Sequence, residues 1–227
     1  MKILAIDTAT ERCSVALWQD GEVWQREQMA SRTHAELILP MIDDLLGDKG
    51  CKLNQLHAIA FGRGPGAFTG VRVAVSVAQG LAFGVGLPLV PVSDLEALAA
   101  AAARLHGISR ALVCMDARMG EVYWAAYSLS PDGIEAHTSE AVSPPPMVIP
   151  PDDGGWFGVG EGFRNYLPEL ELQLRGQLSG MAPDLLPDAR DVAALAAQAY
   201  AQGKFVQAEQ ALPVYLRDKV ASPKPVL

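Results

Sequence analysis

The sequence contains few cysteines: Cys13, Cys51 and Cys114 are the three in 227 residues. Their number is odd, and none belongs to a CxxC pair or to a cluster with histidine. A disulfide framework or a zinc site needs several cysteines at short, regular spacing. The pattern therefore predicts reduced thiols in a reducing compartment. The chain opens on MKILAID without a visible signal peptide, so we expect a cytoplasmic protein.

Positive charge is also scarce. The chain has 18 Lys and Arg against 26 Asp and Glu, which makes its formal net charge −8 at pH 7. A protein that coats nucleic acid needs clustered basic side chains to displace counterions from the phosphates. We therefore expect that any contact with RNA is local or is supplied by a partner.

One long run, residues 73–93, has no charge at all. A membrane span is the less favoured interpretation, because glycine and proline interrupt the run and the helical pattern stops near Gly84. Half of all residues are hydrophobic and 19% are charged, a balance typical of a chain that buries a sizeable core. We expect a soluble protein without membrane contact.

Apolar runs and turn residues in the first half predict an α/β domain with a mixed sheet. Strands are expected at 2–6, 13–18, 22–28, 58–61 and 87–91, and helices at 33–46, 71–83 and 94–105. Asp20 and Gly21 are typical of a tight hairpin turn, Thr33 and Glu36 have the spacing of a capping box, and Ser93 is a helix cap. Strands that begin as a meander and then alternate with helices favour a mixed sheet.

The same order of landmarks recurs after residue 110. Asp7, the Asp20-Gly21 turn and the string FGRGPG at 61–66 are echoed by Asp116, the Asp132-Gly133 turn and FGVGEG at 157–162. Glycine-rich turns can match by chance, but three landmarks in one order favour a duplicated domain. We therefore expect two domains, at 1–105 and 106–227.

The second domain is expected to be a shortened copy of the first. Ten of the 19 residues at 144–162 are proline or glycine, which excludes a helix there. A last helix is expected at 192–202, with Asp191 as its cap and Gly203 as its end.

A candidate phosphate or nucleotide site combines the end of the first strand with the glycine-rich turn. Its residues are Asp7, Thr8, Gly64, Gly66, Thr69 and Gly70. A carboxylate and hydroxyls can face a phosphate or a hydrated magnesium ion, and free backbone N–H groups at a helix start bind anions. Two alternatives stay open: an Asp that caps the next turn, and a tight turn that needs small residues.

The predicted helix at 71–83 lacks a strongly polar face. A helix that is apolar all round must be covered all round, by a neighbouring helix such as 33–46 or by another chain.

His34 opens that neighbouring helix, but Ile38 stands where a second histidine could complete a metal-binding pair, so we expect no metal site.

Several motifs resemble the TsaB (YeaZ) family. They are AIDTAT at 5–10, SRTHAELILP at 31–40, GRGPGAFTGVRVAVSVAQGLA at 62–82, PVSDLEALA at 91–99, DARMGEVYWAAY at 116–127 and PVYLRDKVA at 213–221. The resemblance implies two tandem domains of the ASKHA type, the fold of actin, sugar kinases and the Hsp70 ATPase. It also implies a role in forming threonylcarbamoyladenosine at position 37, 3′ of the anticodon, in tRNAs that read codons beginning with adenine.

The implied role is that of a non-catalytic platform subunit without a cofactor. In the family's pathway the paralogue TsaD transfers the threonylcarbamoyl group and the ATPase TsaE joins the complex. TsaD-like proteins carry an HxxxH pair that His34 and Ile38 match only in part. The resemblance thus implies a TsaD-like and a TsaE-like partner, a homodimer when the chain is alone, and contact with tRNA only through the complex.

Both apolar helices are expected to dock on TsaD through Leu37, Met41, Leu45, Val71, Val75 and Ala78. The competing hypotheses are a phosphotransferase or ATPase that uses Asp7 and the 62–70 turn, a glycopeptidase-like peptidase, and a protein that binds tRNA directly.

Overall fold

The computed structural model describes residues 1–30, 33–151 and 154–217. Its first sheet has the order β3 (Glu22–Met29), β2 (Arg12–Gln19), β1 (Lys2–Asp7), β4 (Ala58–Gly62) and β5 (Leu89–Val92). β1 is antiparallel to β2 and parallel to β4. β2 and β3 form the hairpin expected at Asp20-Gly21, with Gln19 opposite Glu22. The predicted mixed sheet is confirmed.

The second sheet repeats this plan. Its order is β8 (Gly133–Ala136), β7 (Glu121–Ser130), β6 (Arg110–Arg118), β10 (Trp156–Val159) and β11 (Leu178–Ala182), with β9 (Ala141–Ser143) also paired to β7. β6 is antiparallel to β7 and parallel to β10, as β1 is to β2 and β4. The two FGxGxG strings begin in the equivalent strands β4 and β10. The predicted duplication is confirmed by this shared topology.

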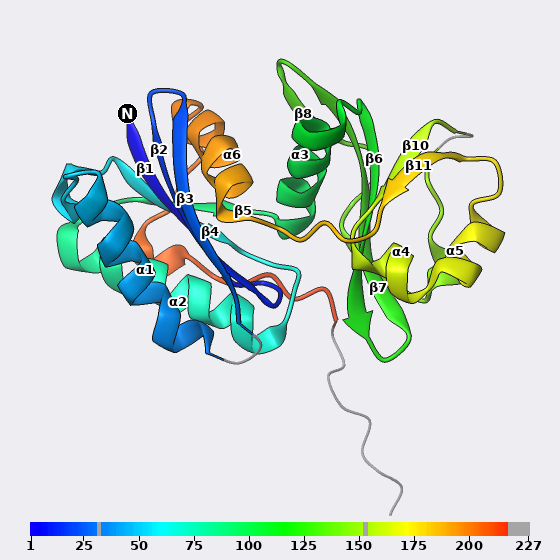
Figure 1. The fold of residues 1–227 in the computed structure, drawn as a ribbon, viewed down its shortest axis with the longest axis horizontal. Helices are drawn as coiled ribbons and strands as arrows, with labels where there is room; N and C mark the ends of the chain where they lie inside the picture. The colour runs from blue at the N-terminus through cyan, green and yellow to red at the C-terminus, as the bar shows by residue number, and fades with distance from the viewer. Residues whose placement is uncertain (31–32, 152–153, 218–227) are drawn as a thin grey trace, which may run out of the picture.

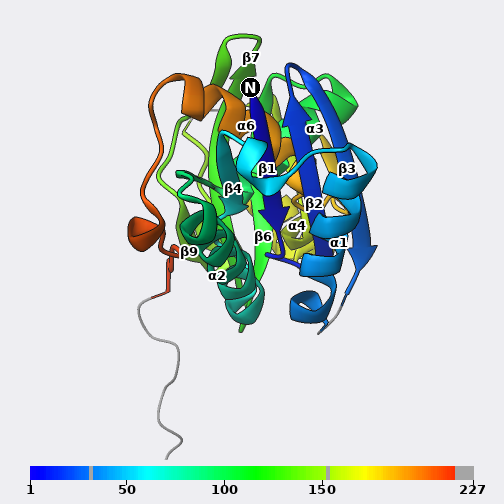
Figure 2. The same ribbon diagram turned by 90° about the vertical axis from the view of Figure 1, so that its left-hand side faces the viewer.

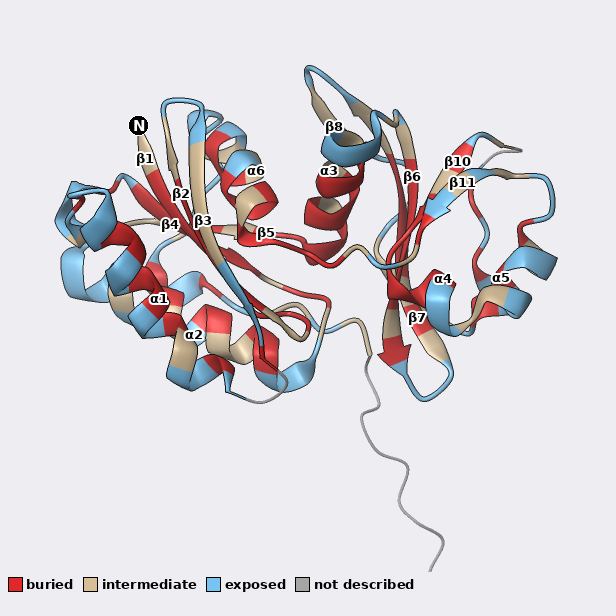
Figure 3. Cartoon of the chain, in the orientation of Figure 1, coloured by how far each residue is buried: buried red, intermediate tan, exposed pale blue. Residues whose placement is uncertain are grey.

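Helices and sheets alternate in five layers (Figure 1), and Figure 2 shows the molecule from the side of α1 and α2. α1 (His34–Asp48) and α2 (Phe68–Val85) cover the outer face of the first sheet, and α6 (Ala189–Ala201) covers its inner face. α3 (Asp94–His106) lies beside α6 and packs on the second sheet, whose outer face is covered by α4 (Glu161–Asn165) and α5 (Leu167–Gln173). Buried residues lie on both sheets and on the helix faces that pack against them (Figure 3).

The two repeats exchange their last helices. α3 follows β5 of the first sheet but packs on β6 and β7, whereas α6 follows β11 of the second sheet but packs on β1 and β2. The chain then returns to the first domain, where Val206 forms an isolated antiparallel β-bridge with Leu89. A boundary at 105/106 therefore separates the two sheets but not the helices that cover them, because each repeat buries its last helix against the other.

The second repeat is reduced in the expected place. Where the first repeat has α1, the described part of the proline-rich segment between β9 and β10 forms a 3₁₀ turn at Pro145–Met147 and no α-helix. Two further 3₁₀ turns lie at Leu53–Gln55 and Ala208–Gln210. Proline cannot supply the N–H groups that a continuous helix needs, which explains the loss of the helix.

Two helix starts and one capping bond differ from the sequence-based expectation. α2 begins at Phe68 rather than 71, and the Thr33 side chain makes no capping bond at α1. α6 begins at Ala189, where the Asp188 carboxylate accepts from the Arg190 N–H, while the expected cap Asp191 pairs with Arg104 instead. The expected Ser93 cap of α3 is confirmed, with Ser93 accepting from the Glu96 N–H at 3.3 Å.

α2 is the helix within the described ranges that is long and apolar enough to cross a membrane, judged by length and composition alone. In this structure it packs on β4 and contacts α1 and the 3₁₀ turn at 208–210. Its position thus gives it a structural partner along one side.

Candidate interdomain cavity and docking face

Asp7 and Thr8 lie at the end of β1 and are fully buried. The Ala9 N–H donates to Asp7 Oδ1 at 2.8 Å, and the Thr8 hydroxyl donates to the Gly70 carbonyl at 2.7 Å. Burial raises the pKa of Asp7 to about 6. Asp7 is thus engaged through Oδ1 and Thr8 through its hydroxyl, which favours the alternative that Asp7 caps the following turn.

The glycine-rich turn lies directly against the segment that follows β1. The Ala67 N–H donates to the Ala9 carbonyl at 2.7 Å. A Cβ on Gly66 would lie 2.6 Å from the Ala9 carbonyl oxygen, and a Cβ on Gly70 would lie 1.9 Å from the Thr8 carbonyl oxygen. Glycine is needed here because two backbones approach closely.

The other two candidate residues of this turn are also accounted for. The Gly64 N–H donates to Asp94, and Gly64 has a φ of +98°, whereas Thr69 is exposed on α2. The arrangement favours the tight-turn alternative, and the phosphate site stays a prediction.

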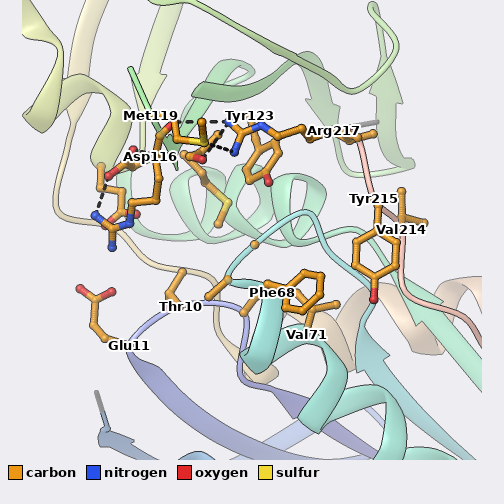
Figure 4. Close-up of a pocket in the computed structure, with 18 residues that line it drawn as sticks. Thr10, Glu11, Phe68, Val71, Asp116, Met119, Tyr123, Val214, Tyr215 and Arg217 are labelled. Atoms are coloured by element: carbon orange, nitrogen blue, oxygen red, sulfur yellow. Dashed lines mark hydrogen bonds and ion pairs between the residues drawn. The ribbon is translucent and has the colours of Figure 1, made fainter. Parts of the chain in front are cut away.

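A cavity of about 220 Å³ opens between the two domains (Figure 4). Its apolar walls come from α2, from β6 and β7, and from the C-terminal segment 214–217, which we call the chain end. They include Phe68, Val71, Met115, Tyr123 and Val214. The sequence pattern predicted Val71 as a partner contact and did not indicate that the chain end closes the cavity.

Carboxyl groups dominate one side of this cavity. Asp116 is held by the Tyr166 hydroxyl at 3.0 Å and by Arg118 at 2.8 Å. The pKa of Glu161 is raised by burial and then by the nearby charges of Glu11 and Asp116. Arg118 is already paired with Asp116, so a polyphosphate placed here would meet several carboxylates with little free positive charge.

The segment 214–217 crosses the mouth of the cavity. The Val214 N–H donates to the Arg63 carbonyl at 2.7 Å, and the Tyr215 ring lies beside Phe68 with 5.9 Å between centroids. Arg217 donates to the Ala117 carbonyl at 3.1 Å and pairs with Glu121. The segment therefore connects the first domain to the β6–β7 hairpin.

The turn that receives Arg217 has an uncommon backbone. Arg118, Met119 and Gly120 have φ values of 61°, 59° and 77°. Consecutive non-glycine residues in this region are rare and are found where surrounding contacts hold them. Gly120 in DARMGEVY is the one residue of this turn whose type favours a positive φ.

His34 has a structural role in this chain. It is buried, and its Nε2 lies 2.7 Å from the Thr10 carbonyl oxygen, so that this nitrogen donates. Ile38 is fully buried in the core one turn further along α1. Among the residues that the structure describes, no group of three or more His, Cys, Asp or Glu could hold a metal ion.

Most of the side chains predicted as partner contacts are buried within this chain, so that their contact with a partner stays a prediction. Five of the six side chains pack in the core between the helices and the first sheet, and Leu37 is half-buried; the five are Met41, Leu45, Val71, Val75 and Ala78. These side chains are not available to another protein in this structure. The sequence could not orient α2, because nearly all of its faces are apolar.

The opposite face of α2 is open to solvent, and we call it the α1–α2 face. It consists of Ala35 and Leu39 from α1 and Thr69, Val73, Ser76, Val77, Gly80 and Phe83 from α2. Val73 and Val77 are half-buried, while Leu39 and Phe83 are 50% and 73% exposed. Exposed apolar side chains gathered on two adjacent helices are typical of a protein contact.

Two glycines on α2 are not required by any close contact within the described chain. A Cβ on Gly80 or on Gly84 would meet nothing within 4 Å. A glycine inside a helix costs about 1 kcal/mol relative to alanine. Glycine on an exposed helix face permits close approach of another backbone.

Comparisons with known proteins agree with this architecture. Residues 27–215 match the family model of TsaD, tRNA N6-adenosine threonylcarbamoyltransferase. The chain is 46% identical to the tRNA threonylcarbamoyladenosine biosynthesis protein TsaB of Escherichia coli, over 97% of this chain and 96% of the relative. It is 41% identical to TsaB of Haemophilus influenzae, over 97% and 95%.

Among solved structures, YeaZ from Pseudomonas aeruginosa is 47% identical and superposes with a TM-score of 0.89, over 95% of this chain and 99% of that one. The ASKHA-like two-domain fold is therefore confirmed. With identity above 40% along almost the whole length and a matching structure, the chain belongs to the TsaB (YeaZ) family, whose named members are tRNA threonylcarbamoyladenosine biosynthesis proteins.

Proposed function

We propose that this protein is a non-catalytic platform subunit in tRNA threonylcarbamoyladenosine biosynthesis. It would act in the cytoplasm with a TsaD-like paralogue, which transfers the threonylcarbamoyl group to adenosine 37, and with a TsaE-like ATPase. The α1–α2 face carries this proposal, because it is an apolar surface on two adjacent helices that the described chain leaves uncovered.

The interior of the molecule supports a non-catalytic role. Asp7 is buried and hydrogen-bonded, and the glycine-rich turn is filled by the chain's own backbone. The side of the cavity that carries Asp116 and Glu161 is acidic. These features disfavour the alternative of a phosphotransferase or ATPase that binds polyphosphate between the domains.

The family model of TsaD matches residues 27–215, which include α1 and α2, so we expect the paralogue to have an equivalent pair of helices. Packing two such helix pairs against each other buries apolar area on both proteins, and a stable complex buries about 1,600 Å² in total. A second copy of this chain could cover the same face when the paralogue is absent.

Substitution on the α1–α2 face tests the proposal. Val77→Asp should abolish copurification with the TsaD-like paralogue, because it places a charge in the apolar contact while the half-buried side chain can still reach solvent. The matched control is Leu172→Asp on α5, an exposed apolar position on the second domain. Val75→Asp is unsuitable, because Val75 is buried in the core.

Reconstitution from purified components tests the role itself. Formation of threonylcarbamoyladenosine in tRNA should require this chain, should fall to the background level with Val77→Asp, and should continue with Leu172→Asp. Modification of tRNA by this chain alone, or full activity of the Val77→Asp complex, would contradict the proposal.

A further inference from the structure

Three side chains form a cluster beside the α1–α2 face: Phe68 and Arg72 from α2, and Tyr215 from the chain end. The Arg72 guanidinium carbon lies 3.2 Å from the centroid of the Phe68 ring and 4.9 Å from that of Tyr215. The two rings are 5.9 Å apart and inclined by 35°. Both rings are about half exposed. We call this cluster the aromatic–arginine triad.

The charge of Arg72 is not neutralised within the described chain. Arg72 is the single charged residue on α2, it makes no ion pair with any described carboxylate, and its buried Nη1 has no acceptor. Aromatic faces stabilise a guanidinium but do not supply hydrogen-bond acceptors. A guanidinium that is oriented by two rings is well prepared to bind a carboxylate.

The triad adjoins the proposed docking face. Phe68 precedes Thr69 on α2, and the chain end that carries Tyr215 is held to the same helix, where Gln79 donates to the carbonyls of Ala208 and Ala211. A protein covering the outward stripe of α2 would therefore also reach the triad. Arginine and tyrosine are among the residues that most often dominate binding energy at protein interfaces.

We propose that the aromatic–arginine triad receives an acidic side chain of the docked paralogue. The partner's carboxylate accepts hydrogen bonds from the Arg72 guanidinium, and the rings of Phe68 and Tyr215 contact the apolar part of the same partner segment. This inference rests on the proposed function, and it extends the docking surface from the two helices onto the chain end.

Binding measurements with the purified paralogue test the proposal. Arg72→Gln and Tyr215→Ala should each weaken the complex by on the order of tenfold to a hundredfold, and Arg72→Gln should also reduce the dependence of affinity on salt. Arg175→Gln, at an exposed arginine of the second domain, is the control and should bind normally. Unchanged affinity for Arg72→Gln, together with loss of binding for Val77→Asp, would contradict the proposed role of the triad. It would still support docking on the α1–α2 face.

A zero-length cross-link identifies the bound group. Arg72→Lys places an amine at the same site, and carbodiimide treatment of the complex should join Lys at position 72 to an Asp or Glu of the paralogue, as read by peptide mass spectrometry. A cross-link to a carboxylate of this chain or of a second copy, or no cross-link in a complex that forms, would overturn the proposal.

Discussion

Asp7 and Asp94 lie against each other in the interior, although one ends β1 and the other begins α3. Asp7 Oδ2 and Asp94 Oδ1 both lack a donor among the described residues. Because two ionised carboxylates cannot satisfy each other, one proton held between them would pair both oxygens. Burial raises the pKa of Asp7 to about 6, and it raises the pKa of Asp94 well above its usual value.

This pair predicts a pH dependence of stability. A carboxyl group whose pKa is raised by folding stabilises the fold below its unfolded pKa, and this contribution is lost as the pH rises through the folded pKa. The free energy of unfolding should therefore fall between pH 4 and 7 because of this pair, by on the order of 1–3 kcal/mol. Urea unfolding at a series of pH values measures the slope.

The Asp94→Asn variant tests whether the Asp7–Asp94 pair causes this dependence of the free energy of unfolding on pH. The amide can still accept from the Gly64 N–H and can donate to Asp7, so the variant should be more stable than the parent at pH 7 and should show a flatter slope. Asp184→Asn, at an exposed carboxylate, should keep the parental slope. An unchanged slope in Asp94→Asn would show that the two carboxyls do not share a proton.

Gly80→Ala should separate stability from binding. Without close neighbours in its own chain, the added methyl group should stabilise the isolated protein by about 0.5–1 kcal/mol. If a partner helix approaches Gly80 closely, the same methyl group should weaken the complex with the paralogue. Gly47→Ala, on the solvent side of α1 and equally open, is the control: it should stabilise the chain and leave binding unchanged.

Gly70→Ala should be strongly destabilising. Its Cβ would lie 1.9 Å from the Thr8 carbonyl oxygen, and a backbone atom cannot move aside as a flexible side chain can. We expect a loss of about 2–4 kcal/mol in the free energy of unfolding, measured by urea denaturation. Gly84→Ala in the same helix meets nothing and should be at least as stable as the parent. Equal stability of both variants would contradict the close contact of the glycine-rich turn with the β1–β2 segment.

Arg217→Ala should loosen the connection between the chain end and the second domain. The guanidinium donates to the carbonyls of Ala117 and Arg118 at 3.1 and 3.3 Å. Hydrogen–deuterium exchange should become about tenfold faster at 117–121 in the variant, which corresponds to about 1.4 kcal/mol. Arg164→Ala on α4 serves as the control, and equal exchange in both variants would show that the chain end does not hold this turn.

Much of the architecture could be predicted from local signals. Short apolar runs, the Asp20-Gly21 turn and the Ser93 cap placed strands and helices within a few residues, and repeated landmarks indicated the duplicated fold. The candidate site was harder to predict, because the glycine-rich turn had two valid explanations. The close contact of Gly70 with Thr8 favours one of them, and it depends on a neighbour 62 positions away in sequence.

By itself, the sequence determined the duplicated α/β topology, the reduced second repeat and the family, because each depends on local patterns or on motifs that can be read in order. The tertiary structure alone decided which face of α2 is buried, that the repeats exchange α3 and α6, and that Tyr215 and Arg217 close the interdomain cavity. α2 is apolar on nearly every side, so its own residues do not specify an orientation. That choice depends on which surfaces the rest of the chain places against it.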